Sequence, residues 1–242
     1  MITARKNRVA DWLLATILRR VMRRRFRAVL VSGLERVEGL DAARSVIACV
    51  NHTNWWDGFV VQLLSREMRP RVSFLAQEER HLARYPLFRW CGVFGIDLDS
   101  SPRAGLRYAL RMLGSPNVVL WFFPQGRIAS AAAPIEIKEG AHFLAMKSGA
   151  QLLPVILRYE WLSESRPTIL VSIGEPLACD APSERLQGAM VQLFKGMDAP
   201  VSSRDLSKFR PLIRRALSLN KRWDWLVHRL TGRMEPFEEL NR

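Results

Sequence analysis

A chain of 242 residues with 48% hydrophobic content is long enough to bury one sizeable core, as one α/β domain or a domain with a helical appendage. Its three cysteines are far apart and form no Cys-x-x-Cys pair, which argues against a disulfide framework or a structural zinc site and indicates a reducing compartment. The formal net charge of +14 calls for an anionic partner, which leaves nucleic acid, anionic lipid and acidic carrier proteins to be considered.

The first expected element is a basic amphipathic helix over residues 9–27. Its apolar arc consists of Leu14, Ile17, Leu18, Val21 and Met22. Most of the arginines between residues 19 and 25 fall on the opposite arc. Such helices suit a membrane interface, and the alternative is a helix packed on the core with its charges in water. Since no apolar run approaches the roughly 18 to 20 residues of a spanning helix, we expect a cytoplasmic protein, peripheral on the inner, anionic face of the membrane.

The middle of the chain alternates between strand and helix patterns. Short apolar runs rich in β-branched residues predict strands at residues 45–50, 118–123, 152–160 and 168–174. Helical patterns occupy residues 57–68, 102–113 and 138–149, and Gly149 is placed to end the last of them. This alternation indicates an α/β fold, in which a mostly buried central sheet is flanked by helices.

The C-terminal part begins with a Pro- and Ser-containing stretch at residues 178–206, which we interpret as a surface connection. A second basic amphipathic helix is expected at residues 221–233, with Trp and Leu on its apolar face. We therefore divide the chain into a membrane-association region (1–38), an α/β core (39–178) and a helical extension (179–242). Nucleic acid is not expected as a partner, because the basic helices carry wide apolar stripes and no nucleic-acid-binding fold is recognised.

The segment Asn-His-Thr-Asn-Trp-Trp-Asp-Gly, residues 51–58, follows the first predicted strand of the core directly. Catalytic groups collect at such strand ends in open α/β sheets. On a continuous helix His52 and Asp57 would be rotated by about 140° and could not meet. A loop-to-helix turn can instead fold Asp57 back, so that its carboxylate accepts from one imidazole nitrogen. The other nitrogen then acts as a base towards a hydroxyl of the substrate.

Two other interpretations of this segment are a polar turn in which Asp57 caps a helix and a metal site. No second cluster of His, Asp or Glu lies near in sequence, so no metal is expected. Trp55 and Trp56 can line an acyl entrance or anchor at a membrane interface, or they can belong to the core of the following helix.

The motif formed by His52 and Asp57 resembles the first signature of the glycerolipid acyltransferases, the family of 1-acylglycerol-3-phosphate acyltransferases. Companion segments follow in the family's order. Residues 92–99 (GVFGIDLD) are similar to its second block, Gly-x-Ile-Phe-Ile-Asp-Arg, and residues 122–127 (FFPQGR) to its third, Phe-Pro-Glu-Gly-Thr-Arg. Residues 138–157 are similar to the downstream Lys-x-Gly-Ala helix and Val-Pro-Val strand.

This resemblance implies transfer of a fatty acyl group from a thioester, either acyl-CoA or acyl carrier protein, to a lipid hydroxyl. It implies that His52 is the general base, that Asp57 orients it, and that the reaction needs no cofactor and no covalent enzyme intermediate. The expected substrate-binding residues are Asn54, Pro124, Gln125, Gly126, Arg127 and Lys138. Independently of the family, a Pro-x-Gly-Arg turn after a buried strand suits an anion site, and the alternative for Arg127 is a surface turn.

Three departures from the family's pattern concern the acceptor. Gln125 replaces the usual glutamate, Arg127 stands in the threonine position with Ile128 in place of the usual arginine, and Leu98 replaces the arginine of the second block. The change to Gln keeps hydrogen-bonding ability and removes a charge. We expect a lysophosphatidate-type acceptor. The first alternative is a neutral acceptor, such as a glycolipid or glycosylated carotenoid hydroxyl, and the second is a membrane-binding module without activity.

Overall fold

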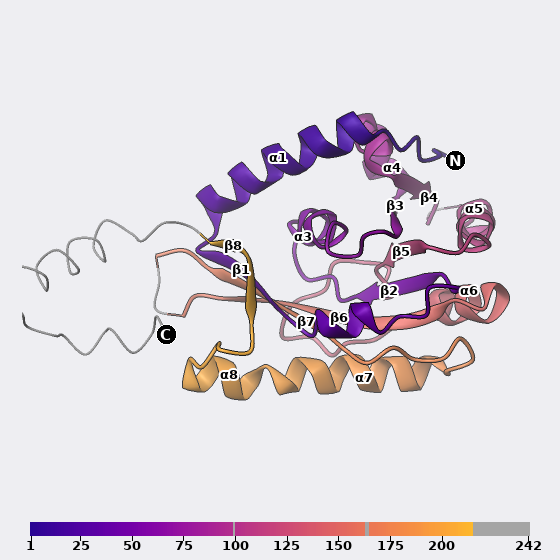
Figure 1. Cartoon of the computed structure of the whole chain (residues 1–242). Helices are drawn as coiled ribbons and strands as arrows, with labels where there is room; N and C mark the ends of the chain where they lie inside the picture. The colour runs from indigo at the N-terminus through magenta and orange to yellow at the C-terminus, as the bar shows by residue number, and fades with distance from the viewer. Residues whose placement is uncertain (99, 163–164, 215–242) are drawn as a thin grey trace, which may run out of the picture.

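The computed structural model describes residues 1–98, 100–162 and 165–214, and within them eight strands form one sheet (Figure 1). The strands are β1 (Ala28–Ser32), β2 (Val46–Val50), β3 (Val72–Glu78), β4 (Val93–Ile96), β5 (Val118–Phe122), β6 (Gln151–Glu160), β7 (Thr168–Ile173) and β8 (Arg210–Arg214). The helices are α1 (Arg8–Arg25), α2 (Glu35–Glu38), α3 (Asp57–Leu64), α4 (Glu79–Arg84), α5 (Arg103–Leu113), α6 (Gly140–Ser148), α7 (Ser183–Gly196) and α8 (Asp198–Ser203), with a 3₁₀ helix η1 (Pro86–Cys91).

The strands lie in the order β4-β3-β5-β2-β6-β7-β1-β8. The pairs from β4 to β6 are parallel, as is β1 with β7, whereas β6 pairs with β7 and β1 with β8 in antiparallel fashion. All five residues of β2 are buried, as a strand covered on both faces requires. The expected α/β fold with a buried central sheet is confirmed.

Helices cover both faces of this sheet. Alternate residues of β2 point to opposite faces, so Val46, Ala48 and Val50 join one hydrophobic cluster, and Ile47 and Cys49 join the other. The first cluster includes buried side chains of α1, α3 and α4, and the second includes those of α5, α6 and α7. Figure 1 shows α1 and α3 above the sheet and α7 below it. The end of β2 therefore lies between two layers of helices.

Helix α1 has the expected position but a different buried face. Asn7 caps its first turn by accepting from the backbone N–H groups of Val9 and Ala10. Three arginines occupy its last turn, where the negative end of the helix dipole stabilises their positive charges. Its buried residues are Ala15, Leu18 and Met22. Ile17, which we assigned to the same arc, is 57% exposed. The first half of α1 is apolar on two sides, because Val9, Trp12 and Leu13 are exposed as well.

The stretch 178–206, which we expected to be a surface connection, contains a helix that packs on the sheet. Residues 183–196 form α7, whose Leu186 and Met190 are buried against the sheet, so this stretch is a helix of the core layer and not a surface connection. The strands β1 and β8 lie in the regions 1–38 and 179–242, so the sheet extends beyond residues 39–178 at both ends. The helix expected at residues 221–233 lies outside the described residues.

Candidate active site

Asn51 fixes the chain at the point where it leaves β2. Its side-chain Nδ2 donates to the carbonyl oxygen of Leu157 at 3.0 Å, and the N–H of Leu157 donates back to its Oδ1 at 2.7 Å. The last backbone pair of these strands is Val50 with Val155, so the amide extends the β2–β6 ladder by one step. Two buried hydrogen bonds, each worth about 1 kcal/mol, therefore hold the segment that follows.

His52 and Asp57 meet directly after this anchor. The Nδ1 of His52 lies 2.9 Å from Oδ2 of Asp57. The same Oδ2 accepts from the backbone N–H groups of Thr53 and Asn54, at 2.7 and 2.8 Å. The carboxylate is fully buried, and the imidazole is 20% exposed. The paired residues and the polar turn are thus one structure, in which the backbone positions the carboxylate that orients the imidazole.

This contact determines which imidazole nitrogen is free. Since a carboxylate can only accept, Nδ1 carries the proton and Nε2 keeps its lone pair in the neutral ring. Phe123 stacks on the ring with centroids 4.2 Å apart and planes at 21°, which fixes the ring's plane. The arrangement can remove a proton from a group placed near Nε2 and return it later.

The β5–α6 loop, residues 123–139, is attached to His52 on both sides. The N–H of His52 donates to Oε1 of Gln125 at 2.7 Å, and its carbonyl oxygen accepts from the N–H of Ala129 at 2.8 Å. Gly126 has a φ of +68°, and a Cβ built there would lie 3.2 Å from Nζ of Lys138. The Lys138 side chain therefore lies over Gly126, while its backbone N–H donates to the carbonyl oxygen of Pro124.

A cavity of about 350 Å³, within the range of small-molecule sites, adjoins this loop. Asn51, Thr53 and Gln125 line one side of it, and Val191 and Phe194 of α7 line another. The cavity therefore lies between the segment that follows β2 and helix α7, whose lining residues are apolar (Val191, Phe194) and polar (Gln187, Lys195) in equal number.

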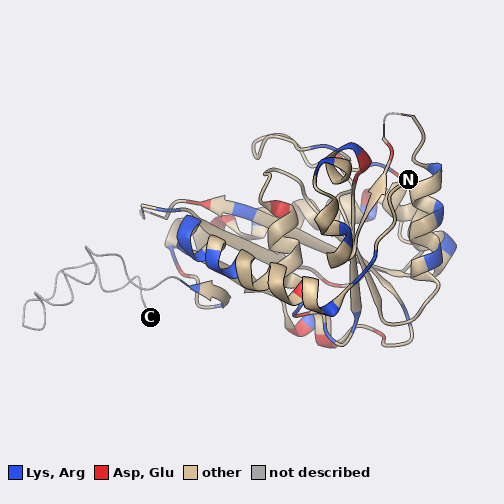
Figure 2. Ribbon diagram, turned by 90° about the horizontal axis from the view of Figure 1, so that it is seen from above, with Lys and Arg blue, Asp and Glu red and all other residues tan. Residues whose placement is uncertain are grey.

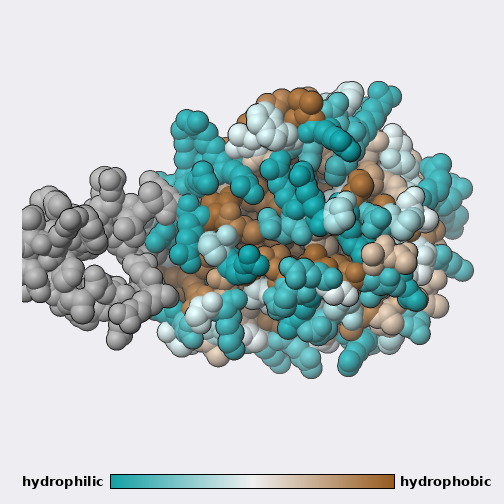
Figure 3. Space-filling model, viewed as in Figure 1, coloured by the Kyte–Doolittle hydropathy of each residue, from teal (hydrophilic) through white to brown (hydrophobic). Residues whose placement is uncertain are grey.

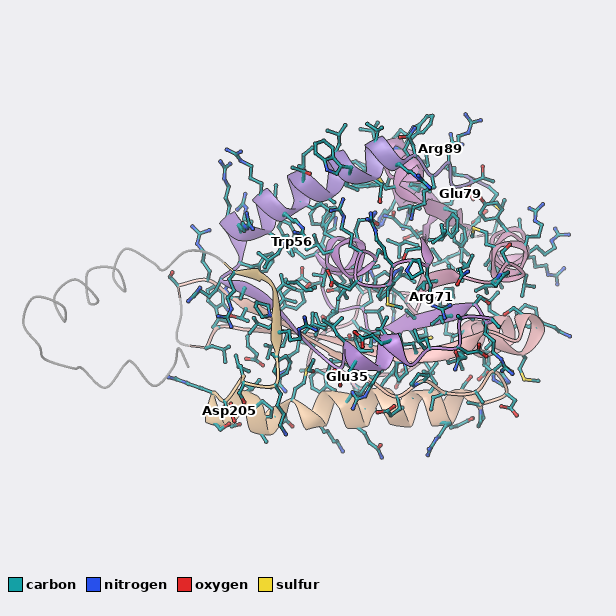
Figure 4. All side chains as sticks on the ribbon, viewed as in Figure 1. Glu35, Trp56, Arg71, Glu79, Arg89 and Asp205 are labelled. Carbon is teal, nitrogen blue, oxygen red and sulfur yellow. The ribbon has the colours of Figure 1, made fainter. Side chains whose placement is uncertain are left out.

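The other predicted site residues divide between the site and the surface. Asn54 uses its Oδ1 to accept from the N–H of Trp56, so it shapes the turn. Trp55 is 61% exposed, whereas Trp56 packs against the core with its ring 5.3 Å from that of Phe26. Figure 4 shows Trp56 between α1 and the sheet. Arg127 is exposed.

Tyr159, near the end of β6, was missed by the sequence analysis. Its hydroxyl donates to Oδ1 of Asp57 at 2.6 Å. Burial and the nearby Asp57 carboxylate raise the pKa of this phenol far above its ordinary value, so it stays protonated and remains a donor. No motif marks this residue. The available signal was the strand predicted at 152–160, which is long enough to pass beside the loop at 51–57 if the two strands are neighbours.

Other kinds of chemistry find little support near His52. Cys49 is buried in the opposite cluster, and burial raises the pKa of its thiol. No group of three or more His, Cys, Asp or Glu side chains that could hold a metal occurs in the described part of the chain.

Among the described residues, no helix has both the length and the apolar character needed to span a bilayer.

Comparisons with known proteins concern the family and the fold of the chain. A family model described as Acyltransferase matches residues 28–158, which is more than half of the chain. The structure is also similar to the crystal structure of the 1-acyl-sn-glycerophosphate (LPA) acyltransferase PlsC from Thermotoga maritima. That likeness has a TM-score of 0.57, covers 78% of both chains and has 18% sequence identity, so it concerns the fold.

Proposed function

The chain belongs to the acyltransferase family, and from this premise we propose that it moves a fatty acyl group from an acyl thioester to a hydroxyl of a membrane lipid. The proposed acceptor is a lysophosphatidate-type glycerolipid, and the proposed donor is acyl-CoA or acyl carrier protein. The observation that carries the proposal is the hydrogen bond between His52 and the buried Asp57, which leaves Nε2 free to act as a base.

The proposed reaction needs one base and no enzyme nucleophile. The acceptor hydroxyl gives its proton to Nε2 of His52 as its oxygen attacks the thioester carbonyl carbon. The C–S bond then breaks, and the imidazolium returns the proton to the departing thiolate. Asp57 stabilises the imidazolium during the exchange, because its buried carboxylate accepts the hydrogen bond of Nδ1. The buried position of Cys49 is consistent with direct transfer, since that thiol does not share the face of His52.

The β5–α6 loop supports a phosphate-bearing acceptor. Lys138 places its ammonium group over Gly126, whose left-handed backbone allows close approach of a ligand to the loop. Arg127, next in sequence, adds a guanidinium that can grip phosphate oxygens with two hydrogen bonds. The observation that favours the neutral alternative is the exposure of Leu98 and Ile128, which stand where the family usually has arginines, and of Arg127, which precedes Ile128.

The outer face of α1 supports membrane attachment. Val9, Trp12, Leu13 and Ile17 are exposed on the helix before its last two turns, which carry most of the arginines. Figure 3 shows hydrophobic surface over α1, and Figure 2 shows Lys and Arg gathered towards its C-terminal end. Apolar side chains beside a row of cations match the acyl and headgroup layers of an anionic membrane. Trp55, between His52 and Asp57 in sequence, is exposed as well.

The test of this function is incubation of the purified protein with labelled acyl-CoA or acyl carrier protein and a panel of lipid acceptors. The panel includes lysophosphatidate, its dephosphorylated counterpart and a glycolipid, presented in anionic vesicles. The proposal predicts an acylated lysophosphatidate product and release of free thiol. Product from the unphosphorylated lipids alone would replace the proposed acceptor by the neutral one. Membrane binding without thioester consumption on any acceptor would instead indicate a module without activity.

A further inference from the structure

The Asp57 carboxylate has a second polar partner besides the turn that contains His52. Its Oδ2 accepts from His52 and from two backbone N–H groups, and its Oδ1 accepts from the Tyr159 hydroxyl at 2.6 Å. The carboxylate has no exposed surface, so each of its hydrogen bonds is made in a dry environment, where charge-assisted bonds are strong. Tyr159 therefore contacts the charge that faces the imidazole.

The fold fixes the position of this hydroxyl. Residues 156–160 of β6 continue past the end of β2 and stay in the sheet through pairing with β7, in which Tyr159 lies opposite Ile169. Alternation along the strand puts Val155, Leu157 and Tyr159 on the same face, and the Asn51 side chain locks this register at Leu157. On its other side the Tyr159 ring lies 6.1 Å from the Phe26 ring, so the phenol is packed as well as bonded.

We propose that Tyr159 is a positioning residue of the His52–Asp57 pair: its hydroxyl fixes the orientation of the carboxylate and withdraws part of the negative charge from Oδ2. With less negative charge on Oδ2, the carboxylate stabilises the imidazolium less. The imidazolium therefore gives up its proton more readily to a departing thiolate. The catalytic part of this inference rests on the proposed acyl transfer. The part that concerns proton binding by His52 does not.

Few other groups can account for a titration of this pair. The aromatic rings of Phe123 and Phe26, which pack against His52 and Tyr159, do not ionise. Lys138 lies over Gly126 in the β5–α6 loop, and Arg127 is exposed to solvent. Within the described chain, Asp57 and Tyr159 are the titratable side chains whose hydrogen bonds form the chain of contacts that ends at the His52 ring.

The experiment compares wild type with Tyr159→Phe, which removes the hydroxyl and keeps the ring. The matched control is Tyr108→Phe, because Tyr108 is also a partly buried tyrosine whose hydroxyl is bonded to a backbone oxygen, on α5 away from the pair. The first measurement is the NMR titration of the His52 imidazole, with its signal assigned by its loss in His52→Ala. The titration midpoint should move to higher pH in Tyr159→Phe and stay in place in Tyr108→Phe.

The second measurement is the pH dependence of kcat. In Tyr159→Phe, kcat should fall by about tenfold and its acidic limb should move to higher pH, while KM for the thioester changes less than about twofold. An unchanged NMR midpoint and unchanged pH profile would overturn the inference, even if the variant unfolds at a lower temperature. A shifted midpoint in a protein that acylates no acceptor would uphold the positioning of the imidazole and refute the proposed function.

Discussion

At the scale of single residues, Asp57 is the most constrained group of the site. Four donors from His52, Thr53, Asn54 and Tyr159 converge on its two oxygens. An ionised carboxylate is the side chain that accepts from all of them, since an amide of the same shape presents one oxygen and one NH₂ group. The demand for acceptors alone therefore selects Asp over Asn at this position.

Asp57→Asn should fold and lose activity. Its NH₂ group must face either the Tyr159 hydroxyl or the cluster of donors at Oδ2, so the imidazole loses its fixed tautomer and orientation. We expect kcat to fall by at least about 10² with little change in KM for the thioester. Steady-state kinetics on folded protein measure this, with the exposed Asp205→Asn as the matched control. Near-normal kcat in Asp57→Asn would contradict the assigned role.

Arg127 tests the identity of the acceptor. Because this side chain is exposed, water screens it, and we expect Arg127→Ala to raise KM for lysophosphatidate by about tenfold and not by the larger factor of a buried pair. Arg127→Lys should recover only part of the loss, since an ammonium cannot reproduce the planar fork. Arg107→Ala, an exposed arginine on α5, is the control. A wild-type preference for unphosphorylated lipid that Arg127→Ala leaves unchanged would contradict the phosphate acceptor.

At the scale of elements, apolar runs in the sequence predicted the strands β2, β5, β6 and β7, whereas β1, β3, β4 and β8 were not predicted. The strands β2, β5, β6 and β7 are continuous apolar runs and were located correctly, and Gly149 ends α6 with the expected left-handed backbone, at φ +71°. The strand β4 has four residues, one of them glycine, and β8 contains a proline on an edge. Such segments are strands because neighbours pair with them, which local patterns do not reveal.

Helix α1 illustrates a different limit of sequence patterns. A helical projection distinguishes apolar from charged arcs, but it does not decide which of two apolar sides faces the sheet. Ala15, Leu18 and Met22 are buried in the core. Ile17 is exposed, as are Val9, Trp12 and Leu13. The exposed surface of α1, for which we propose membrane contact, is therefore divided along the helix, apolar first and basic last, whereas the sequence pattern predicts a division around the helix.

This division predicts how α1 responds to substitution. Arg20→Ala combined with Arg24→Ala should weaken binding to anionic vesicles by about 2 kcal/mol, roughly 30-fold, because each cation near the surface contributes about 1 kcal/mol. Leu13→Ser combined with Ile17→Ser should weaken binding to neutral and anionic vesicles alike. Sedimentation with both vesicle types at low and high salt measures these effects.

The control for α1 is Met146→Ser, an exposed apolar residue on α6 in the opposite helical layer, which should leave vesicle binding unchanged. Equal sedimentation with neutral and anionic vesicles, insensitive to salt, would count against the assigned surface. Salt-sensitive binding of DNA with comparable strength would point to nucleic acid as the partner of the basic residues instead.

At the scale of the whole molecule, the site joins segments that are distant in sequence, and this explains which parts of it were predictable. His52 and Asp57 lie within one turn, and five residues of spacing suffice to suggest their pairing. Gln125 reaches His52 from 73 positions away and Tyr159 reaches Asp57 from 102, because the sheet places β5 and β6 on either side of β2. Motif spacing identified Gln125 through its resemblance to a family block, whereas Tyr159 required the register of β6.

The proposed acyl transfer depends on His52 as its base. It is tested most directly by His52→Ala, assayed for transfer of labelled acyl groups to lysophosphatidate in anionic vesicles beside wild type and the matched His142→Ala. His142 is bonded to the backbone of Ala181 in the opposite helical layer, so its loss removes an imidazole without touching the site. We expect turnover to fall by at least about 10² in His52→Ala and to stay near wild type in His142→Ala. Near-normal turnover in correctly folded His52→Ala would contradict it.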